Sequence, residues 1–388
     1  MIIESIGIGM VVVLLLAWGL LEWTHRRRQG NALEALPGNW QFESREPQHY
    51  RLVGEQTFFN PTRKLEVMIP ELSVDVTLLS KGSLDEIHHK VKVIPKHPDV
   101  EPREDGYWFA YIVKSRYQTA AEIILDITGP DLRALKAAWV QVNYISYGPK
   151  GRLSNTHHEV IPLRFPDPTQ TLKWRPVQGG QVLPIPTHLL TQLDTCPDIV
   201  RRYVSPHAQS GDIVTIGETP VAIMQGRTIH PSTIQPGWVA KRLVYFFLPT
   251  SSLATACGMQ TLVDIEGPVR VFLAFVVGAI AKVFGQAGMF YRLAGEQARL
   301  IDDVTGTLPP FDQFIVLGPD DPQKVVNQIQ AETGLAAAIV DVNDLKRVKI
   351  LSATKDALLP LIEEALRSNP AGNADEQTPV VLIRPNAS

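Results

Sequence analysis

The sequence predicts an α+β protein in three parts: an N-terminal transmembrane helix, an antiparallel β-sandwich-like domain and a mixed α/β domain. Three observations predict this fold class. The chain starts with one long apolar run, short segments of alternating apolarity follow over residues 64–166, and strands alternate with helices over residues 184–388. The 388 residues are 45% hydrophobic and 20% charged, so the chain is long enough for two or three folded domains.

Charge and cysteine content exclude several classes of function. The formal net charge is −3, and Lys and Arg do not exceed the acidic residues, so nucleic acid is not an expected partner. Cys196 and Cys257 have neither the spacing of a metal site nor that of a disulfide framework. Two ordinary thiols are typical of a reducing compartment.

The first part, residues 1–29, is expected to be a membrane anchor. The stretch "SIGIGMVVVLLLAWGLLEW", residues 5–23, supplies about eighteen apolar residues, which extend roughly 27 Å as a helix. Arg26, Arg27 and Arg28 follow the run, and a signal peptide would carry its charge before it. The positive-inside rule then predicts a single-pass membrane protein with most of the chain in the cytoplasm.

Residues 30–63 are expected to form a linker, and residues 64–166 the β-sandwich-like domain. Six segments alternate in apolarity and are separated by Gly, Pro, Asp and Asn, as in antiparallel sandwiches or barrels: "KLEVMIP", "LSVDVTLL", "GYWFAYIVKS", "AAEIILDIT", "WVQVNYISYG" and "HHEVIPLRF". The pairs His88–His89 and His157–His158 do not indicate a metal site, because neighbouring strand residues point to opposite faces. They are expected at the surface or at the edge of the core.

A second linker is expected at residues 167–183, because "PDPTQTLKWRPVQGGQVLPIP", residues 166–186, holds five prolines and two glycines. The α/β domain then follows as residues 184–388. "DIVTIG", "QFIVLG", "LAAAIVDV" and "TPVVLIRP" are its predicted strands. "TPVAIMQGR", with Thr219 as N-cap, and "DDPQKVVNQIQAETG", with Asp321 as N-cap and Gly334 as stop, are predicted helices, as is "KDALLPLIEEALRS".

One segment permits two interpretations. "VFLAFVVGAIAKVF", residues 271–284, is apolar on all sides before Lys282, but at about 21 Å it is too short to span a bilayer. It is either a fully buried helix or an interfacial helix that binds the membrane surface.

Acidic residues follow two apolar segments of the α/β domain. Asp302 and Asp303 follow "ARLI", and Asp341 follows "AAIV", with Asp344 close behind. Ligands of open α/β sheets gather at the carboxyl ends of strands, and divalent cations prefer carboxylate oxygens. Both stretches are therefore expected to end beside one acidic pocket, in which Asp302 and Asp341 bind a divalent cation. The alternative is that Asp302, Asp303 and Asp344 only cap turns, where Asp is common.

The order of several short motifs over about residues 183–386 resembles the coenzyme F-420-0:L-glutamate ligase (gamma-glutamyl ligase) family. These motifs are "GDIVTIGE" with the later Gly226-Arg227, "ARLIDDVTGT", "LGPDDPQKVVNQIQAETG", "AAIVDVNDLKR" and "NADEQTPVVLIRP". The resemblance implies GTP or another nucleotide and a divalent metal, Mg or Mn, as cofactors. It implies metal-binding roles for Asp302 and Asp341, and nucleotide- or substrate-binding roles for Glu218, Arg227, Asp303, Asn343 and Asp344.

The resemblance also implies a reaction. A carboxylate of a deazaflavin- or pterin-type acceptor would be phosphorylated, and the amine of glutamate, or a similar amine, would attack the acyl phosphate to form an amide. The family carries Ser-Lys ahead of its Gly-Arg, whereas this chain has Ala222-Ile223. A non-catalytic ligase-like domain, which binds or assembles partners at the membrane through its β-domain, therefore stands as the alternative function.

Overall fold

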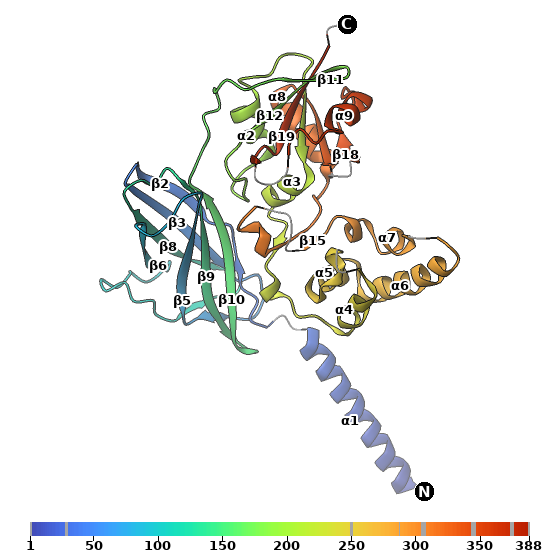
Figure 1. The fold of residues 1–388 in the computed structure, drawn as a ribbon. Coiled ribbons are helices and arrows are strands. Elements are labelled where there is room, and N and C mark those ends of the chain that lie inside the picture. The colour runs from blue at the N-terminus through green and yellow to red at the C-terminus, as the bar shows by residue number, and fades with distance from the viewer. Residues whose placement is uncertain are drawn as a thin grey trace.

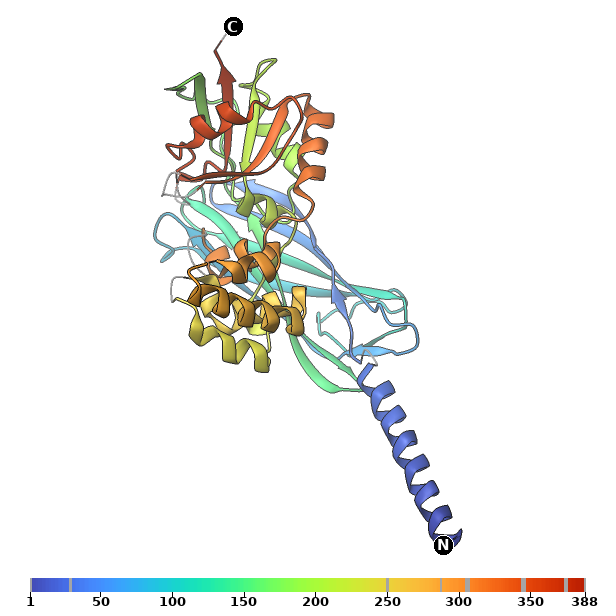
Figure 2. The same cartoon turned by 90° about the vertical axis from the view of Figure 1, so that its right-hand side faces the viewer.

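A computed structural model describes residues 2–27, 30–248, 251–286, 288–303, 308–342, 347–372 and 376–386, without the side chains of residues 2–9, 11, 12, 25–27 and 303. A β-sandwich, a mixed sheet covered by helices and a lobe of helices lie beside one another, and helix α1 (Ile2–Arg27) projects from them (Figures 1 and 2). The predicted α+β class therefore applies to the chain beyond α1. This part has three folded regions, where two domains were expected.

Helix α1 contradicts the expected transmembrane anchor. Among the residues that the structure describes, no helix is both long enough and apolar enough to cross a membrane. The predictions of an anchor at residues 1–29 and of a single-pass membrane localisation are therefore wrong on this finding.

The sandwich consists of two five-stranded antiparallel sheets. The first sheet contains β1 (Glu34–Ala35), β2 (Asn39–Glu46), β3 (His49–Phe59), β6 (His88–Lys96) and β8 (Gln118–Thr128). The second contains β4 (Val67–Ile69), β5 (Leu72–Ser80), β7 (Tyr111–Val113), β9 (Leu135–Gly148) and β10 (Gly151–Pro162). The predicted antiparallel sandwich is confirmed.

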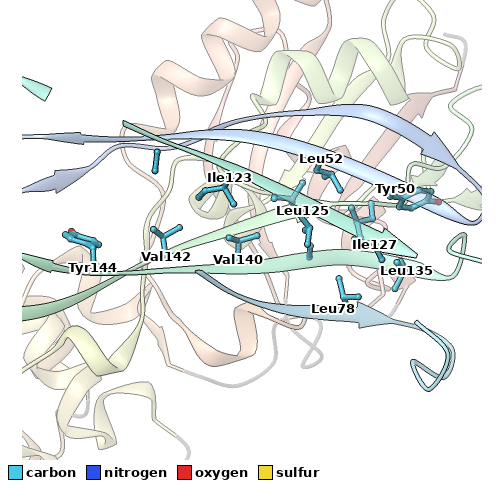
Figure 3. Close-up of a cluster of buried hydrophobic side chains, with 14 of the residues drawn as sticks. Tyr50, Leu52, Leu78, Ile123, Leu125, Ile127, Leu135, Val140, Val142 and Tyr144 are labelled. Atoms are coloured by element: carbon cyan, nitrogen blue, oxygen red, sulfur yellow. The ribbon is translucent and has the colours of Figure 1, made fainter. Parts of the chain in front are cut away.

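Alternating side chains of the facing strands form the sandwich core. Leu52 of β3 and Ile123 and Leu125 of β8 are fully buried against Val140 and Val142 of β9, between the two layers (Figure 3). Burial of apolar side chains from both sheets is the main favourable term for this arrangement.

Strands β1, β2 and β3 lie within residues 30–63, which were expected to be a linker. The period-2 pattern of β3 is interrupted at Gly54 and at Gln56, which is buried although it is polar. The Gln56 amide nitrogen donates to the carbonyl oxygen of Leu36 at 2.6 Å, so the burial of this nitrogen is compensated by a hydrogen bond that the sequence pattern does not reveal.

The mixed sheet of the C-terminal domain has the strand order β11-β12-β19-β13-β17-β18. Its strands are β11 (Arg175–Val177), β12 (Gly180–Ile185), β13 (Ile213–Gly217), β17 (Ala336–Val342), β18 (Val348–Ala353) and β19 (Val380–Pro385). Only β13 and β17, of the neighbouring pairs described, run parallel. Strand β11 and the start of β12 fall inside the expected linker at residues 167–183, because they pair with each other and β12 pairs with β19.

Helices cover both faces of this sheet. They are α2 (Cys196–Ile199), which continues as η1 (Val200–Val204), α3 (Glu218–Met224), α8 (Pro322–Thr333) and α9 (Leu359–Leu366). Val326 and Ile329 of α8 pack in one hydrophobic cluster, and Ile362 and Leu366 of α9 pack in the other.

The caps of α8 match the sequence expectation, whereas that of α3 differs. The Asp321 carboxylate accepts a hydrogen bond from the Lys324 amide at 3.1 Å, and Gly334 ends α8 in the left-handed conformation at φ 75°. Helix α3 begins at Glu218 after Gly217, rather than after the expected N-cap Thr219. Helix α3 thus starts directly at the end of β13.

The helical lobe, residues 238–293, is inserted between α3 and α8. It contains α4 (Trp238–Leu243), α5 (Ala256–Glu266), α6 (Pro268–Val283) and α7 (Met289–Leu293). A three-stranded sheet of β14 (Thr228–Ile229), β16 (Ile315–Val316) and β15 (Asp302–Asp303) lies at its base. Short turns complete this region: η2 (Pro231–Thr233), η3 (Val244–Phe246), η4 (Ser252–Ala254), η5 (Glu296–Arg299) and η6 (Phe311–Gln313).

Candidate functional site

The register between β13 and β17 brings two carboxylates to one edge of the mixed sheet. Gly217 pairs with Val340 in the parallel ladder, and the next residues are Glu218 and Asp341. Because parallel strands end at the same edge, both side chains leave the sheet there. Glu218 is also the first residue of α3, so the turn from strand to helix fixes its position.

A third carboxylate reaches this edge from a different sheet. Asp302 lies on β15, opposite Val316 of β16. Residues 228–229, on β14, pair with the other side of β16. The small sheet therefore holds Asp302 in place from outside the mixed sheet.

Glu218, Asp302 and Asp341 line one cavity of about 390 Å³. Its wall comes from the ends of β13 and β17, the start of α3, the segment before η6 and the segments on either side of residues 373–375. Besides these acids, its polar lining residues include Thr187, Thr215, Thr219, Asn369, Gln377 and Thr378, and Leu308 and Phe311 are among its apolar ones. This size is within the range of small-molecule sites.

Burial and mutual repulsion perturb two of the three carboxyls. The pKa of Glu218 is raised from 4.5 to about 8, first by burial and then by the negative charges of Asp341 and Asp302, while Lys349 acts in the opposite direction. The pKa of Asp302 is raised from 3.8 to about 6, again by burial first and by Asp341 second. The Glu218 Oε2 atom is buried and has no hydrogen-bond partner among the described residues. Near neutral pH Glu218 therefore holds a proton that a cation could displace.

The described lining of the cavity contains no Lys or Arg. Its one basic residue, His188, is already engaged: Nδ1 lies 2.7 Å from the Tyr203 hydroxyl and Nε2 lies 2.8 Å from the Asp194 carboxylate. The wall is thus acidic, and a phosphate-bearing ligand would need a cation to enter it.

The structure places the predicted site residues unequally. Asp302 and Asp341, the predicted metal ligands, and Glu218, a predicted substrate-binding residue, meet at the cavity. Arg227 does not line it, because its Nε donates to the carbonyl oxygen of Gly318 at 2.6 Å. Asn343, Asp344 and the side chain of Asp303 lie outside the described part of the chain.

The three carboxylates are not a preformed metal cage. Within the described ranges, no group of three or more His, Cys, Asp or Glu side chains is arranged to hold a metal ion. A cation at this edge would need further oxygen ligands from water or from a phosphate, as is usual for Mg²⁺.

The helix that carries Glu218 packs against the β-sandwich. Ala222 and Ile223 of α3 belong to one buried cluster with Ala137 of β9 and Val160 of β10. Ala222 is fully buried, which explains why an apolar residue occupies this place. The sequence could not reveal this contact, because the partners are more than 60 residues away.

A second junction lies beside this cluster. The His158 ring of β10 stacks on that of His230 with centroids 4.5 Å apart, and Trp139 and Phe314 pack against them. Burial lowers the pKa of His158 to about 4, with smaller contributions from His230 and His157. His158 therefore lies at the edge of the core, as expected of this pair, and serves to join domains.

Comparison with known proteins gives one specific match, to the sandwich. No curated protein matches the chain. The solved structures found include the GAE domain of GGA2p from Saccharomyces cerevisiae (9% identity, TM-score 0.21), which covers 34% of this chain and 98% of that one. A protein from Archaeoglobus fulgidus (8% identity, TM-score 0.19) covers 33% and 94%. These similarities are too low to support any conclusion about fold or function.

The family match is more specific. Residues 34–165 match the family model described as the N-terminal Ig-like domain of F420-0:gamma-glutamyl ligase. This range is the β-sandwich, which the sequence resemblance over residues 183–386 did not use. The chain therefore contains a domain that matches the N-terminal Ig-like domain of F420-0:gamma-glutamyl ligase, which confirms a partial resemblance to that ligase family over residues 34–165.

Proposed function

We propose that the C-terminal domain is an amide ligase whose acidic cavity binds a divalent cation, Mg²⁺ or Mn²⁺, together with the phosphates of a nucleotide such as GTP. The observation that carries this proposal is the convergence of Glu218, Asp302 and Asp341 on one cavity, with raised pKa values for the first two. Raised carboxyl pKa values in a cavity are typical of sites that bind cations or move protons.

The residues present fit a hard cation. Such ions prefer one or two carboxylates completed by phosphate oxygens and water. Asp302 and Asp341 would supply the carboxylates, and the unpartnered Oε2 of Glu218 would gain a partner. The cation would supply the positive charge that the described lining lacks.

The family match of the sandwich supports a ligase-like relationship. In the proposed reaction a carboxylate of the acceptor attacks the terminal phosphorus of the nucleotide, and the nucleoside diphosphate leaves. The amine of glutamate then attacks the acyl carbon, the phosphate leaves and the nitrogen loses a proton as the amide forms. This chain's contribution is to position the reactants and, through Glu218 in its deprotonated form, to accept that proton.

A second candidate function is a ligase-like binding or assembly protein without catalysis. Its support is the pair Ala222 and Ile223, which lie where the family carries Ser-Lys and are packed against the sandwich. A site without that hydroxyl and cation would bind a ligand but transfer no phosphoryl group. The sandwich would then be the contact surface for a partner.

Thermal unfolding of the full chain tests both candidates. We expect Mn²⁺ or Mg²⁺ to raise the midpoint, and GTP or ATP to raise it further only with metal, because a ligand of the native state stabilises it by mass action. Asp302→Asn should abolish the metal effect, whereas Glu363→Gln, an exposed acid on α9, should not. Failure of both metals to raise the midpoint would refute the metal site.

Phosphate release separates the two candidates. The ligase predicts inorganic phosphate that appears only with metal, nucleotide, a carboxylate acceptor and glutamate together. Metal- and nucleotide-dependent stabilisation without phosphate release, for deazaflavin- and pterin-type acceptors alike, would favour the binding protein.

A further inference from the structure

Helix α6 forms the outer layer of the helical lobe, on the side away from the β-sandwich (Figures 1 and 2). One stripe of it is buried: Val271, Ala274 and Gly278 face the rest of the lobe. Gly278 permits the closest approach, because a Cβ built there would lie 2.9 Å from the backbone nitrogen of Phe290 on α7. Helix α6 is therefore packed on the lobe along one side. The interpretation of residues 271–284 as a fully buried helix is wrong.

The other side of α6 exposes large apolar side chains. Leu273 is 56% exposed, Ile280 55% and Val283 84%, although a soluble surface normally leaves such residues only singly exposed. The exposed apolar residues of α6 and its C-terminal end are Val269, Phe272, Leu273, Val276, Val277, Ile280, Val283 and Phe284.

Aromatic residues from the neighbouring segment extend this face. The ring of Trp238 on α4 lies 6.3 Å from that of Phe272, and the ring of Phe246 lies 5.0 Å from that of Phe275. Trp238 is 65% exposed and Phe246 is 70% exposed, and Tyr245 next to it is also exposed. We call the exposed residues of α6 together with these three the lobe surface.

Basic side chains accompany the lobe surface. Lys241 lies one helical turn from Trp238 on α4, and Lys282 precedes Val283 on α6, and both are exposed. Residues 238–293 hold five basic residues, Lys241, Arg242, Arg270, Lys282 and Arg292, and two acidic ones, Asp264 and Glu266. Glu266 is already paired with Arg270, so the lobe is locally positive in a chain whose net charge is −3.

We propose that the lobe surface docks on an anionic lipid surface, with α6 in the plane of the headgroups. Exposed Trp, Tyr and Leu side chains bordered by Lys and Arg are the combination that interfacial helices use. A second copy of the chain is the less favoured occupant, because a two-fold interface would place the basic residues of both copies together with few acids to offset them.

A local fluorescent probe tests the proposal, since α1 also exposes apolar side chains and makes whole-chain vesicle binding ambiguous. Leu273→Cys is labelled with an environment-sensitive dye in the full chain carrying Cys257→Ala; Cys196 is buried and the pKa of its thiol is raised to about 12. We expect a blue shift with vesicles of equal phosphatidylcholine and phosphatidylserine, which is weakened by salt. The same dye at Ser83→Cys, exposed on the sandwich, should not respond.

Charge reversal provides the second measurement. Lys241→Glu with Arg242→Glu should raise the lipid concentration for half-maximal blue shift about tenfold or more. No response at residue 273, or an equal response with phosphatidylcholine alone, would overturn the proposal. A blue shift without lipid that grows with protein concentration would instead assign the lobe surface to a second copy of the chain.

Discussion

Replacement of Glu218 by Gln should remove a strong pH dependence from the stability of the protein. The pKa of this carboxyl is about 8 in the folded chain, against 4.5 as its ordinary value. Because the folded state then binds the proton more tightly, stability is lost as the pH rises from 4.5 towards 8. Below pH 4.5 both states are protonated and the group has no effect.

Proton linkage gives the magnitude. A carboxyl with these two pKa values destabilises the folded state by about 1 kcal/mol at pH 5 and by about 4 kcal/mol at pH 8. Glutamine carries no charge, so the free energy of unfolding of Glu218→Gln should exceed that of the parent, and the difference should grow as the pH rises from 5 to 8. The added margin between pH 5 and pH 8 is expected to be about 3 kcal/mol.

Urea denaturation of the full chain at several pH values, with EDTA present, measures this difference. Glu363→Gln is the matched control, because that glutamate is exposed on α9 of the same domain. Histidines titrate in the same interval, but they are common to parent and variants and cancel in the comparison. If the difference in free energy of unfolding between Glu218→Gln and the parent is the same at pH 5 and pH 8, the pKa of Glu218 is not raised in the folded chain.

Three further substitutions test the packing. Arg384→Met should cost about 3–5 kcal/mol in urea denaturation, because it leaves the buried Asp212 without the guanidinium that contacts it at 2.8 and 2.9 Å. Asp321→Ala removes the N-cap of α8 and should cost about 1 kcal/mol by the same assay. Gly278→Val should destabilise the chain by about 1–3 kcal/mol, measured as a lower thermal midpoint, because its side chain meets the backbone of Phe290.

Each of these substitutions has a matched control. Adding Asp212→Asn to Arg384→Met should recover part of the loss, since the uncompensated charge is gone. Asp320→Ala, next to the cap, should cost less than Asp321→Ala, whose carboxylate makes the capping bond. Ala279→Val, on the exposed side of α6, should be nearly neutral. A control that costs as much as its partner would contradict the mechanism assigned to that partner.

Local patterns predicted much of the fold. The alternation in residues 64–166 predicted the sandwich, and Asp321 and Gly334 marked the two ends of α8. The patterns failed where distant partners decide the structure. Residues 30–63 resembled a linker because Gly54 and Gln56 break the apolar alternation of β3. Pairing with β8 and the hydrogen bond of Gln56 nevertheless make β3 a central strand of its sheet.

In the candidate site, too, local patterns predicted some features, and others depend on residues that are distant in the sequence. Strand ends predicted that Asp302 and Asp341 could meet, but the perturbation of Glu218 depends on a register that only the folded sheet defines. The position of Arg227 could not be foreseen, because Gly318, which accepts its hydrogen bond, is 91 residues away. The apolar run of α6 was recognised, but its exposed face follows from which stripe packs on α7.

The place of β19 in its sheet has a consequence for how the protein is made. This strand follows all the others of the mixed sheet in the chain, yet it pairs with β12 on one side and β13 on the other. During translation the Ig-like domain can fold as soon as residues 34–165 have left the ribosome. The mixed sheet cannot join its two halves until β19 emerges, and until then β12 and β13 present unpaired edges that invite aggregation or chaperone binding. We therefore expect nascent chains that end between β18 and β19 to expose these strand edges to chaperones.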